Sequence, residues 1–260
     1  RDLHSFPTRR SSDLFVTLLE KAQRINNAMP ARMAQRPQVS ETVIPEKEFI
    51  TVKQAKEKFK IPIYLNDDDK LLLLKGDVLV KGNITRQWTE DLMEGLHWEG
   101  DAYGIFIDGN LTVAGDILDD NYLHLRVSGN VICDYLFTYN GAIFIMKDLY
   151  TTFGLYGEYN DGMLDVLGNT NAPYFVEVGH YMPDKSKVTE FIFVEAENET
   201  EQEDCYLHDP ETGYLEESWK LLRPEVWEEN KLFSYFSINH FFQLIKNGKN
   251  PLISVDTYKK

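Results

Sequence analysis

One phrase recurs along the middle third of this chain: apolar residues at alternate positions, interrupted by a glycine that Asp or Asn follows. Aligned on that glycine, the last four copies are separated by 20, 18 and 21 residues, and Lys147 replaces the glycine in the fourth copy. A period near 20 with strand-like content is typical of a solenoid, in which each repeat buries its apolar side against its neighbours. The five copies span residues 72–84, 105–117, 125–131, 143–149 and 164–170.

The apolar residues of each copy share one parity. Because side chains alternate between the two faces of a strand, such a set lies on one side of the strand. The glycines keep the same phase, so we expect them where the wall bends inward, with Asp or Asn accepting the unusual backbone angles of the corner. The predicted inward residues are Leu72, Leu74, Val78, Val80, Ile84, Ile105, Ile107, Leu111, Val113, Ile117, Leu123, Leu125, Val127, Val131, Cys133, Ile143, Ile145, Leu149 and Thr151.

These patterns predict a mainly β fold: a right-handed parallel β-helix of about five rungs with helical N- and C-terminal caps. An antiparallel sandwich gives no reason for one motif to recur in register. We expect a helical N-terminal cap and linker over residues 15–65, the β-helix over residues 66–195, and an acidic loop with a helical C-terminal cap over residues 196–260. Within the caps, Thr51 is predicted to begin one helix and Ser237 another, which ends at Gly248.

Residues 1–14 resemble the translation of a short-read sequencing adaptor, and we expect them to be an artefact that takes no part in the fold. The native N-terminus is then expected to be missing by an unknown length. Removing the three arginines and two aspartates of this segment makes the remainder one charge more acidic than the −15 of the whole chain.

That acidity opposes binding to nucleic acid or to an anionic membrane surface, because both carry negative charge. No apolar run approaches the ~20 residues that span a bilayer. Cys133 has the inward parity and is expected to be buried, whereas Cys205 lies in an acidic stretch and is expected to be exposed. Two unpaired thiols indicate a reducing compartment, so we expect a cytoplasmic protein.

The insertion of residues 86–104 between the first two copies is rich in aromatic residues. Excursions from a regular solenoid often carry binding residues. We therefore take Trp88, His97, Trp98 and Tyr103 as the candidate binding residues. Packing of the same side chains over a face or an end of the solenoid is the alternative interpretation.

Some β-helices cleave polysaccharides, which requires two carboxyl groups on either side of the scissile bond. Asp119, Asp120 and His124 are the candidate catalytic residues for that alternative function. A solvated corner rich in Asp is the simpler explanation of the cluster and the one that we prefer. The histidines show no metal-ligand spacing, so neither a metal nor a cofactor is expected.

The phrase Gly-Asn-Leu-Thr-Val-Ala-Gly-Asp-Ile at residues 109–117 resembles bactofilins, the polymer-forming bacterial β-helix proteins, and looks nearer to a group of uncharacterised bacterial proteins. The resemblance covers residues 71–170 and implies the fold more than a function. We expect a non-enzymatic scaffold or protein-interaction module, including an immunity-like role, whose partner is another and basic protein. The alternative is a carbohydrate-active lyase or hydrolase. The aromatic tail of residues 233–245 is expected to dock on the last rung or to mediate oligomerisation.

Overall fold

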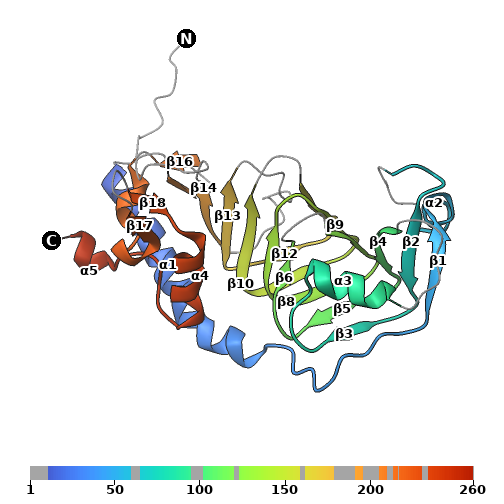
Figure 1. Cartoon of the computed structure of the whole chain (residues 1–260). Helices are drawn as coiled ribbons and strands as arrows, with labels where there is room; N and C mark the ends of the chain where they lie inside the picture. Colours follow the sequence, from blue (N-terminus) through green and yellow to red (C-terminus); the bar gives the residue numbers. More distant parts are fainter. Residues whose placement is uncertain are drawn as a thin grey trace, which may run out of the picture. The chain divides into compact units, whose positions relative to one another are not determined.

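A computed structural model gives the fold of the chain (Figure 1). The chain divides into two compact units, one of residues 1–31 and 191–260 and the other of residues 32–190. The structure describes residues 11–59, 65–94, 102–119, 123–158, 162–178, 191–195, 205–209, 213–215, 217–229 and 234–259.

The larger unit contains two β-sheets. In the first sheet β1 pairs antiparallel with β2, and every later pair is parallel. The antiparallel strand lies at the edge of the sheet, so β2 is paired on both sides. In spatial order the strands are β1 (Lys47–Thr51), β2 (Lys70–Leu74), β4 (Ala102–Ile107), β7 (His124–Val127), β9 (Ala142–Ile145) and β11 (Met163–Val166).

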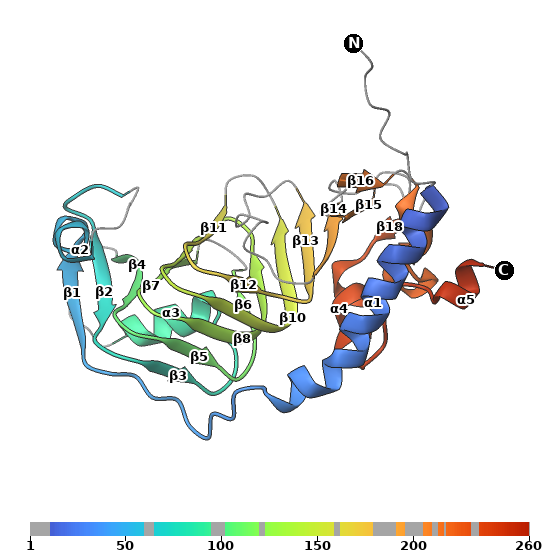
Figure 2. The ribbon, with the colours of Figure 1, turned by 180° about the vertical axis from the view of Figure 1, so that it is seen from behind.

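The strands of the second sheet also pair in parallel, and they alternate along the chain with those of the first (Figure 2). Each turn of the chain therefore adds a strand to both sheets. The result is a mixed α/β structure with a β-solenoid of about four turns from residue 105 onward, preceded by β2 and β3, which pair in parallel with it. The strands are β3 (Val78–Val80), β5 (Leu111–Val113), β6 (Ile117–Leu118), β8 (Val131–Thr138), β10 (Leu149–Glu158), β12 (Thr170–Asn171) and β13 (Tyr174–Val178).

The interior of the solenoid is the predicted one. Every residue of the inward set, from Leu72 to Thr151, is at most 2% exposed. Burying an apolar side chain of this size stabilises a fold by about 1.5–3 kcal/mol relative to leaving it in water. The two-residue period in the sequence therefore identified the core correctly.

The helix α2 (Val52–Phe59) begins where the sequence predicts. The Thr51 hydroxyl accepts a hydrogen bond from the Gln54 N–H (3.1 Å), and the Gln54 side chain accepts one from the Thr51 N–H (2.8 Å). This reciprocal pair satisfies two backbone donors at the helix start.

The α2 helix covers the outer face of the first sheet at its N-terminal end. Leu71, Leu73 and Phe106 are fully buried there, although their parity points them away from the solenoid interior. The Phe59 ring stacks on the Phe106 ring with centroids 4.0 Å apart. Both faces of β2 are covered, which agrees with the continuous run of leucines at residues 71–74.

A ladder of Asp and Asn side chains joins the turns at one corner. In each step, a side-chain oxygen of one turn accepts a hydrogen bond from the backbone N–H of the equivalent residue in the next turn. The N···O distances are 2.8–3.1 Å for the steps from Asp77 to Asn110, Asn130, Asp148 and Asn169 in order. We call this the Asx ladder. Asn83 and Asp116 make the same contact at another corner, at 2.9 Å.

The glycines beside the ladder are required by the close stacking of backbones. A Cβ atom on Gly129 would lie 2.5 Å from the carbonyl oxygen of Gly109, a distance that real Cβ atoms do not reach. The prediction that Asp and Asn adopt unusual corner angles is wrong. Among the described residues, Glu217 is the one non-glycine residue with positive φ, so the Asp and Asn residues of the ladder have ordinary backbone angles. The Asp and Asn residues are required for hydrogen bonding, not for their backbone conformation.

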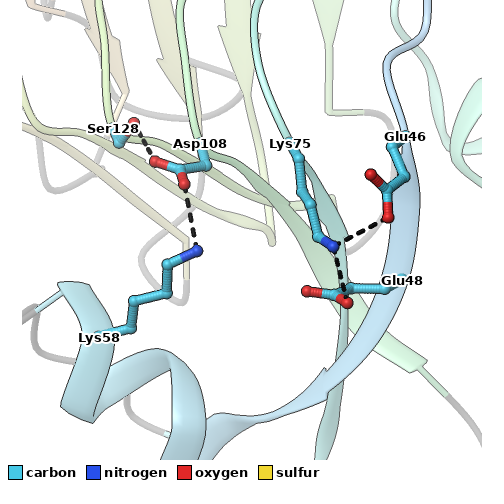
Figure 3. Close-up of polar contacts among 6 residues, drawn as sticks. All are labelled: Glu46, Glu48, Lys58, Lys75, Asp108 and Ser128. Atoms are coloured by element: carbon cyan, nitrogen blue, oxygen red, sulfur yellow. Dashed lines mark hydrogen bonds and ion pairs between the residues drawn. The ribbon is translucent and has the colours of Figure 1, made fainter.

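Ion pairs fix β1 and α2 to the same end of the larger unit (Figure 3). The Lys75 ammonium contacts Glu46 at 3.0 Å and Glu48 at 2.9 Å, and these hydrogen bonds raise the pKa of Lys75. The Lys58 ammonium contacts Asp108, which also accepts a hydrogen bond from Ser128. All of these pairs are exposed, so each contributes little to stability.

The smaller unit combines helices with short antiparallel strands. Its elements are α1 (Ser11–Ala34), whose last three residues belong to the larger unit, β14 (Ile192–Glu195), β15 (Tyr206–Asp209), β16 (Gly213–Leu215), the 3₁₀ helices η3 (Ser218–Leu221) and η4 (Pro224–Val226), β17 (Trp227–Glu229), β18 (Ser234–Phe236), α4 (Ile238–Lys246) and α5 (Val255–Tyr258).

The ends of α4 match the sequence prediction. The Ser237 hydroxyl accepts a hydrogen bond from the His240 N–H, and Gly248 follows the helix with φ of 72°. The prediction of an exposed Cys205 is wrong. It directly precedes β15, it is fully buried, and burial raises the pKa of its thiol.

We predict that Asp148→Ala weakens the Asx ladder at one step. The substitution leaves the Asn169 N–H without its acceptor, which lowers the free energy of unfolding by about 1–2 kcal/mol. Thermal unfolding followed by circular dichroism measures the loss, and amide hydrogen exchange of Asn169 locates it. Asp148→Asn keeps the acceptor oxygen and is the control. Equal destabilisation by both substitutions would contradict a hydrogen-bonding role.

Candidate functional site

A pocket of about 310 Å³ lies within the larger unit, between the outer face of the second sheet and the chain segment 32–37. Its volume is at the lower end of the range for small-molecule sites. Its walls combine apolar, amide and cationic groups. The lining residues are Arg32, Gln35, Pro37, Ile132, Cys133, Tyr150, Thr151, Thr152 and Asn171.

The apolar wall of the pocket comes from neighbouring strands. Ile132 in β8 is in register with Tyr150 in β10, which is in register with Asn171 in β12. These positions have the outward parity, opposite to the buried Cys133 and Thr151. Ile132 is 37% exposed and Tyr150 is 42% exposed, so two large apolar surfaces lie side by side in contact with water.

Arg32 supplies the cationic wall. Its guanidinium donates hydrogen bonds to the carbonyl oxygens of Thr151 (2.6 Å), Thr152 (3.3 Å) and Asn171 (3.5 Å). Partial burial lowers the pKa of Arg32. Its charge contacts neutral carbonyl groups, and no carboxylate pairs with it among the residues that the structure describes.

Arg36 holds the same segment against the sheet by a different contact. Its guanidinium forms a two-pronged ion pair with the carboxylate of Asp134, which is 3% exposed. It also lies over the Phe153 ring, 5.6 Å from the centroid. Bidentate arginine–carboxylate pairs fix geometry strongly, so the pocket wall formed by residues 32–37 is anchored.

The thiol in the pocket wall is not suited to nucleophilic chemistry. It belongs to Cys133, which is fully buried, and burial raises the pKa of this thiol well above its usual value. A protonated, buried thiol is unreactive. No cluster of metal-ligating side chains is present in the described part of the chain.

The predicted binding residues fall partly outside the described structure. Trp88 lies on α3 (Arg86–Met93). Thr85 caps this helix, since its side chain accepts a hydrogen bond from the Trp88 N–H. Tyr103 lies on β4, but its side chain is outside the described residues, as are His97 and Trp98 entirely. Their joint role in binding therefore stays a prediction.

Of the candidate catalytic residues, Asp119 serves the fold. It is fully buried, and its carboxylate accepts hydrogen bonds from the backbone N–H groups of Leu123 (2.8 Å), Tyr139 (2.9 Å) and Gly141 (2.5 Å). A carboxylate with three backbone donors holds loops together. Asp120 is outside the described residues, so a catalytic Asp pair stays untested.

Two basic side chains, Arg126 and His124, lie on the same side of β7. Arg126 is 4% exposed, its Nε and Nη1 atoms have no hydrogen-bond partner, and burial lowers its pKa to about 10. It is in register between Phe106 and Phe144. His124, on the same side of β7, has its Nδ1 atom buried without a partner. Burial lowers the pKa of His124, Arg126 lowers it further, and Asp119 opposes the shift.

One signal for the pocket is present in the sequence, although it was not part of the prediction. Ile132 and Tyr150 occupy the same outward position of consecutive repeats, where a solvated wall would carry polar residues. Arg32 and Arg36 lie within residues 15–65, which were predicted to form the N-terminal cap and linker. Their contacts with residues about 100 positions away cannot be derived from local patterns.

The low pKa of His124 predicts a pH dependence of stability. Because the folded-state pKa lies below the unfolded value of about 6.5, the unfolded chain binds the proton more readily, and stability falls as the pH drops below about 6.5. His124→Gln removes this titration. The wild type should therefore lose more unfolding free energy than the variant between pH 8 and pH 5, by up to about 1.4 kcal/mol per pH unit.

Urea unfolding at pH 5, 6, 7 and 8 measures this difference. The pH 8 values correct for the change in packing, since His124 is neutral there in both states. Parallel stability curves of the two proteins across this range would contradict the assignment.

Comparison with protein-family models, with curated proteins and with solved structures finds no match for this chain. In the part of the chain that the structure describes, no helix is both long and apolar enough to cross a membrane. The β-solenoid arrangement and the pocket on its second sheet are therefore the observations on which a function is proposed.

Proposed function

We propose that this protein is a non-enzymatic β-solenoid module that binds another protein on the outer face of its second sheet. The observation that carries the proposal is the pair of exposed apolar side chains, Ile132 and Tyr150, which lie on adjacent strands and form one wall of the pocket. Contiguous exposed apolar surface beside polar groups is typical of interaction sites.

The rigidity of this face supports the proposal. Backbone hydrogen bonds join β5, β8 and β10, and the Asx ladder ties the same turns at their corner. A preformed surface loses little conformational entropy on binding, which favours affinity. The solenoid is in this respect a scaffold that keeps its binding residues in place.

Charge indicates the kind of partner. A net charge of −15 favours association with a basic protein and raises the rate of encounter with it. An immunity-like role, in which an acidic protein neutralises a basic toxin, fits this charge. Nucleic acid and anionic membranes are disfavoured by the same reasoning, and a cytoplasmic location stays part of the proposal.

The resemblance to bactofilins bears on assembly. We infer a right-handed coil, because crossover connections between parallel strands almost always have that hand. The antiparallel β1, together with the bridge between Val43 and Leu79, occupies the N-terminal edges of both sheets. An occupied edge disfavours end-to-end polymerisation, so we infer a capped N-terminal end. Capping or oligomerisation through the aromatic C-terminal tail stays a prediction.

We predict that Ile132→Lys combined with Tyr150→Lys abolishes partner binding and leaves the fold intact, because both side chains are exposed. Tagged wild type and variant are compared by quantitative mass spectrometry after recovery from cells of the source organism. A partner should be enriched by the wild type and depleted at least about tenfold by the variant, since lysines desolvated at an apolar contact cost more than 1.4 kcal/mol.

Leu167→Lys is the matched control. Leu167 is 49% exposed and follows β11 of the other sheet, so this substitution should leave the same partner enriched. Binding of one partner equally by all three proteins would place the interaction elsewhere, and recovery of no specific partner would count against a binding module.

A further inference from the structure

The charge of Arg32 distinguishes the pocket from an ordinary apolar depression. Two arginines lie four residues apart on the segment 32–37, and they are used differently. Arg36 is neutralised by the buried carboxylate of Asp134. Arg32 donates three hydrogen bonds to backbone carbonyl oxygens, and no carboxylate in the described part of the chain pairs with it.

The hydrogen bonds of Arg32 also fix its position. Nε and Nη2 are held by the carbonyl groups of Thr151, Thr152 and Asn171, all from the pocket wall. A guanidinium has five N–H donors in a rigid plane, so donors remain for a further acceptor. A held cation with spare donors is preorganised for an anion.

The other pocket-lining residues indicate what the uncharged part of a ligand would be. The Tyr150 ring and the Ile132 side chain offer apolar surface, while Gln35 and Asn171 contribute amide groups. This combination suits one negative charge attached to a flat apolar group. A phosphate ester carries about two charges and three acceptor oxygens, which a single arginine does not match.

We propose that this pocket binds a small organic monocarboxylate with a flat apolar or aromatic body, whose carboxylate pairs with Arg32 and whose body lies against Tyr150 and Ile132. This inference does not rest on the proposed protein-binding function. The pocket volume of about 310 Å³ sets the ligand size at that of a single-ring acid.

The experiment titrates the full chain with phenylacetate and with the uncharged isostere phenylacetamide, monitored by ¹H–¹⁵N correlation spectra. We expect the backbone amide signals of Thr151, Thr152 and Asn171 to shift with phenylacetate, which binds at least about tenfold more tightly than the amide, because a hydrogen bond to a charged group contributes about 1.5–3 kcal/mol. Raising the NaCl concentration should weaken the binding of phenylacetate. Equal binding of the two probes, or shifts confined to other residues, would overturn the proposal.

Two sets of variants test the role of Arg32. Arg32→Gln should reduce the affinity for phenylacetate at least about tenfold, to that of phenylacetamide. Because Arg32 also ties its segment to the sheet, a second pair keeps that tie: Ile132→Glu places a competing carboxylate at the exposed pocket wall, and Ile132→Gln is its uncharged match. Both substitutions remove the same apolar contact, so a much greater loss of phenylacetate affinity in Ile132→Glu than in Ile132→Gln supports the proposal. Equal binding by this pair, or full affinity in a folded Arg32→Gln protein, refutes it.

Discussion

The Asx ladder is the interaction on which the solenoid depends. Parallel strands fix the spacing of the turns, but strands alone allow a turn to slip by two residues without changing which side chains point inward. A side-chain oxygen that accepts the backbone N–H of the next turn removes this freedom, because it pairs one residue with one residue. The stacked glycines beside the ladder allow the corners to approach closely enough for these bonds to form.

Much of the fold was predictable from the sequence, and for a physical reason. The parity of Leu72, Ile105 and their equivalents reports burial directly, since alternation is the geometry of a strand. The same reasoning gave a wrong explanation for Asp and Asn at the corners. A local pattern indicates that such a residue is required, but it does not distinguish a backbone requirement from a hydrogen bond to the next turn.

The arginine contacts of the candidate site could not be predicted from the sequence, because they join distant segments of the chain. Arg32 contacts residues about 120 positions away, and Arg36 pairs with the buried carboxylate of Asp134, 98 positions away. The carboxylate at Asp119 shows the converse case. Its clustering with His124 was the basis of the alternative catalytic prediction, whereas its three backbone donors, 4 to 22 residues away in the chain, give it a structural role. Sequence proximity identified the strands, but it did not show that the Asp119 carboxylate accepts hydrogen bonds from backbone groups.

The spacing of the ladder steps has a consequence for change within this fold. The first step joins residues 33 positions apart and the next three join residues 20, 18 and 21 apart, yet all four bonds have similar lengths. The extra length of the first interval includes α3. The hydrogen bonds at this corner therefore keep the turns aligned, whatever the length of chain between them. Residues can therefore be inserted into one turn, by evolution or by design, without changing the register of the other turns.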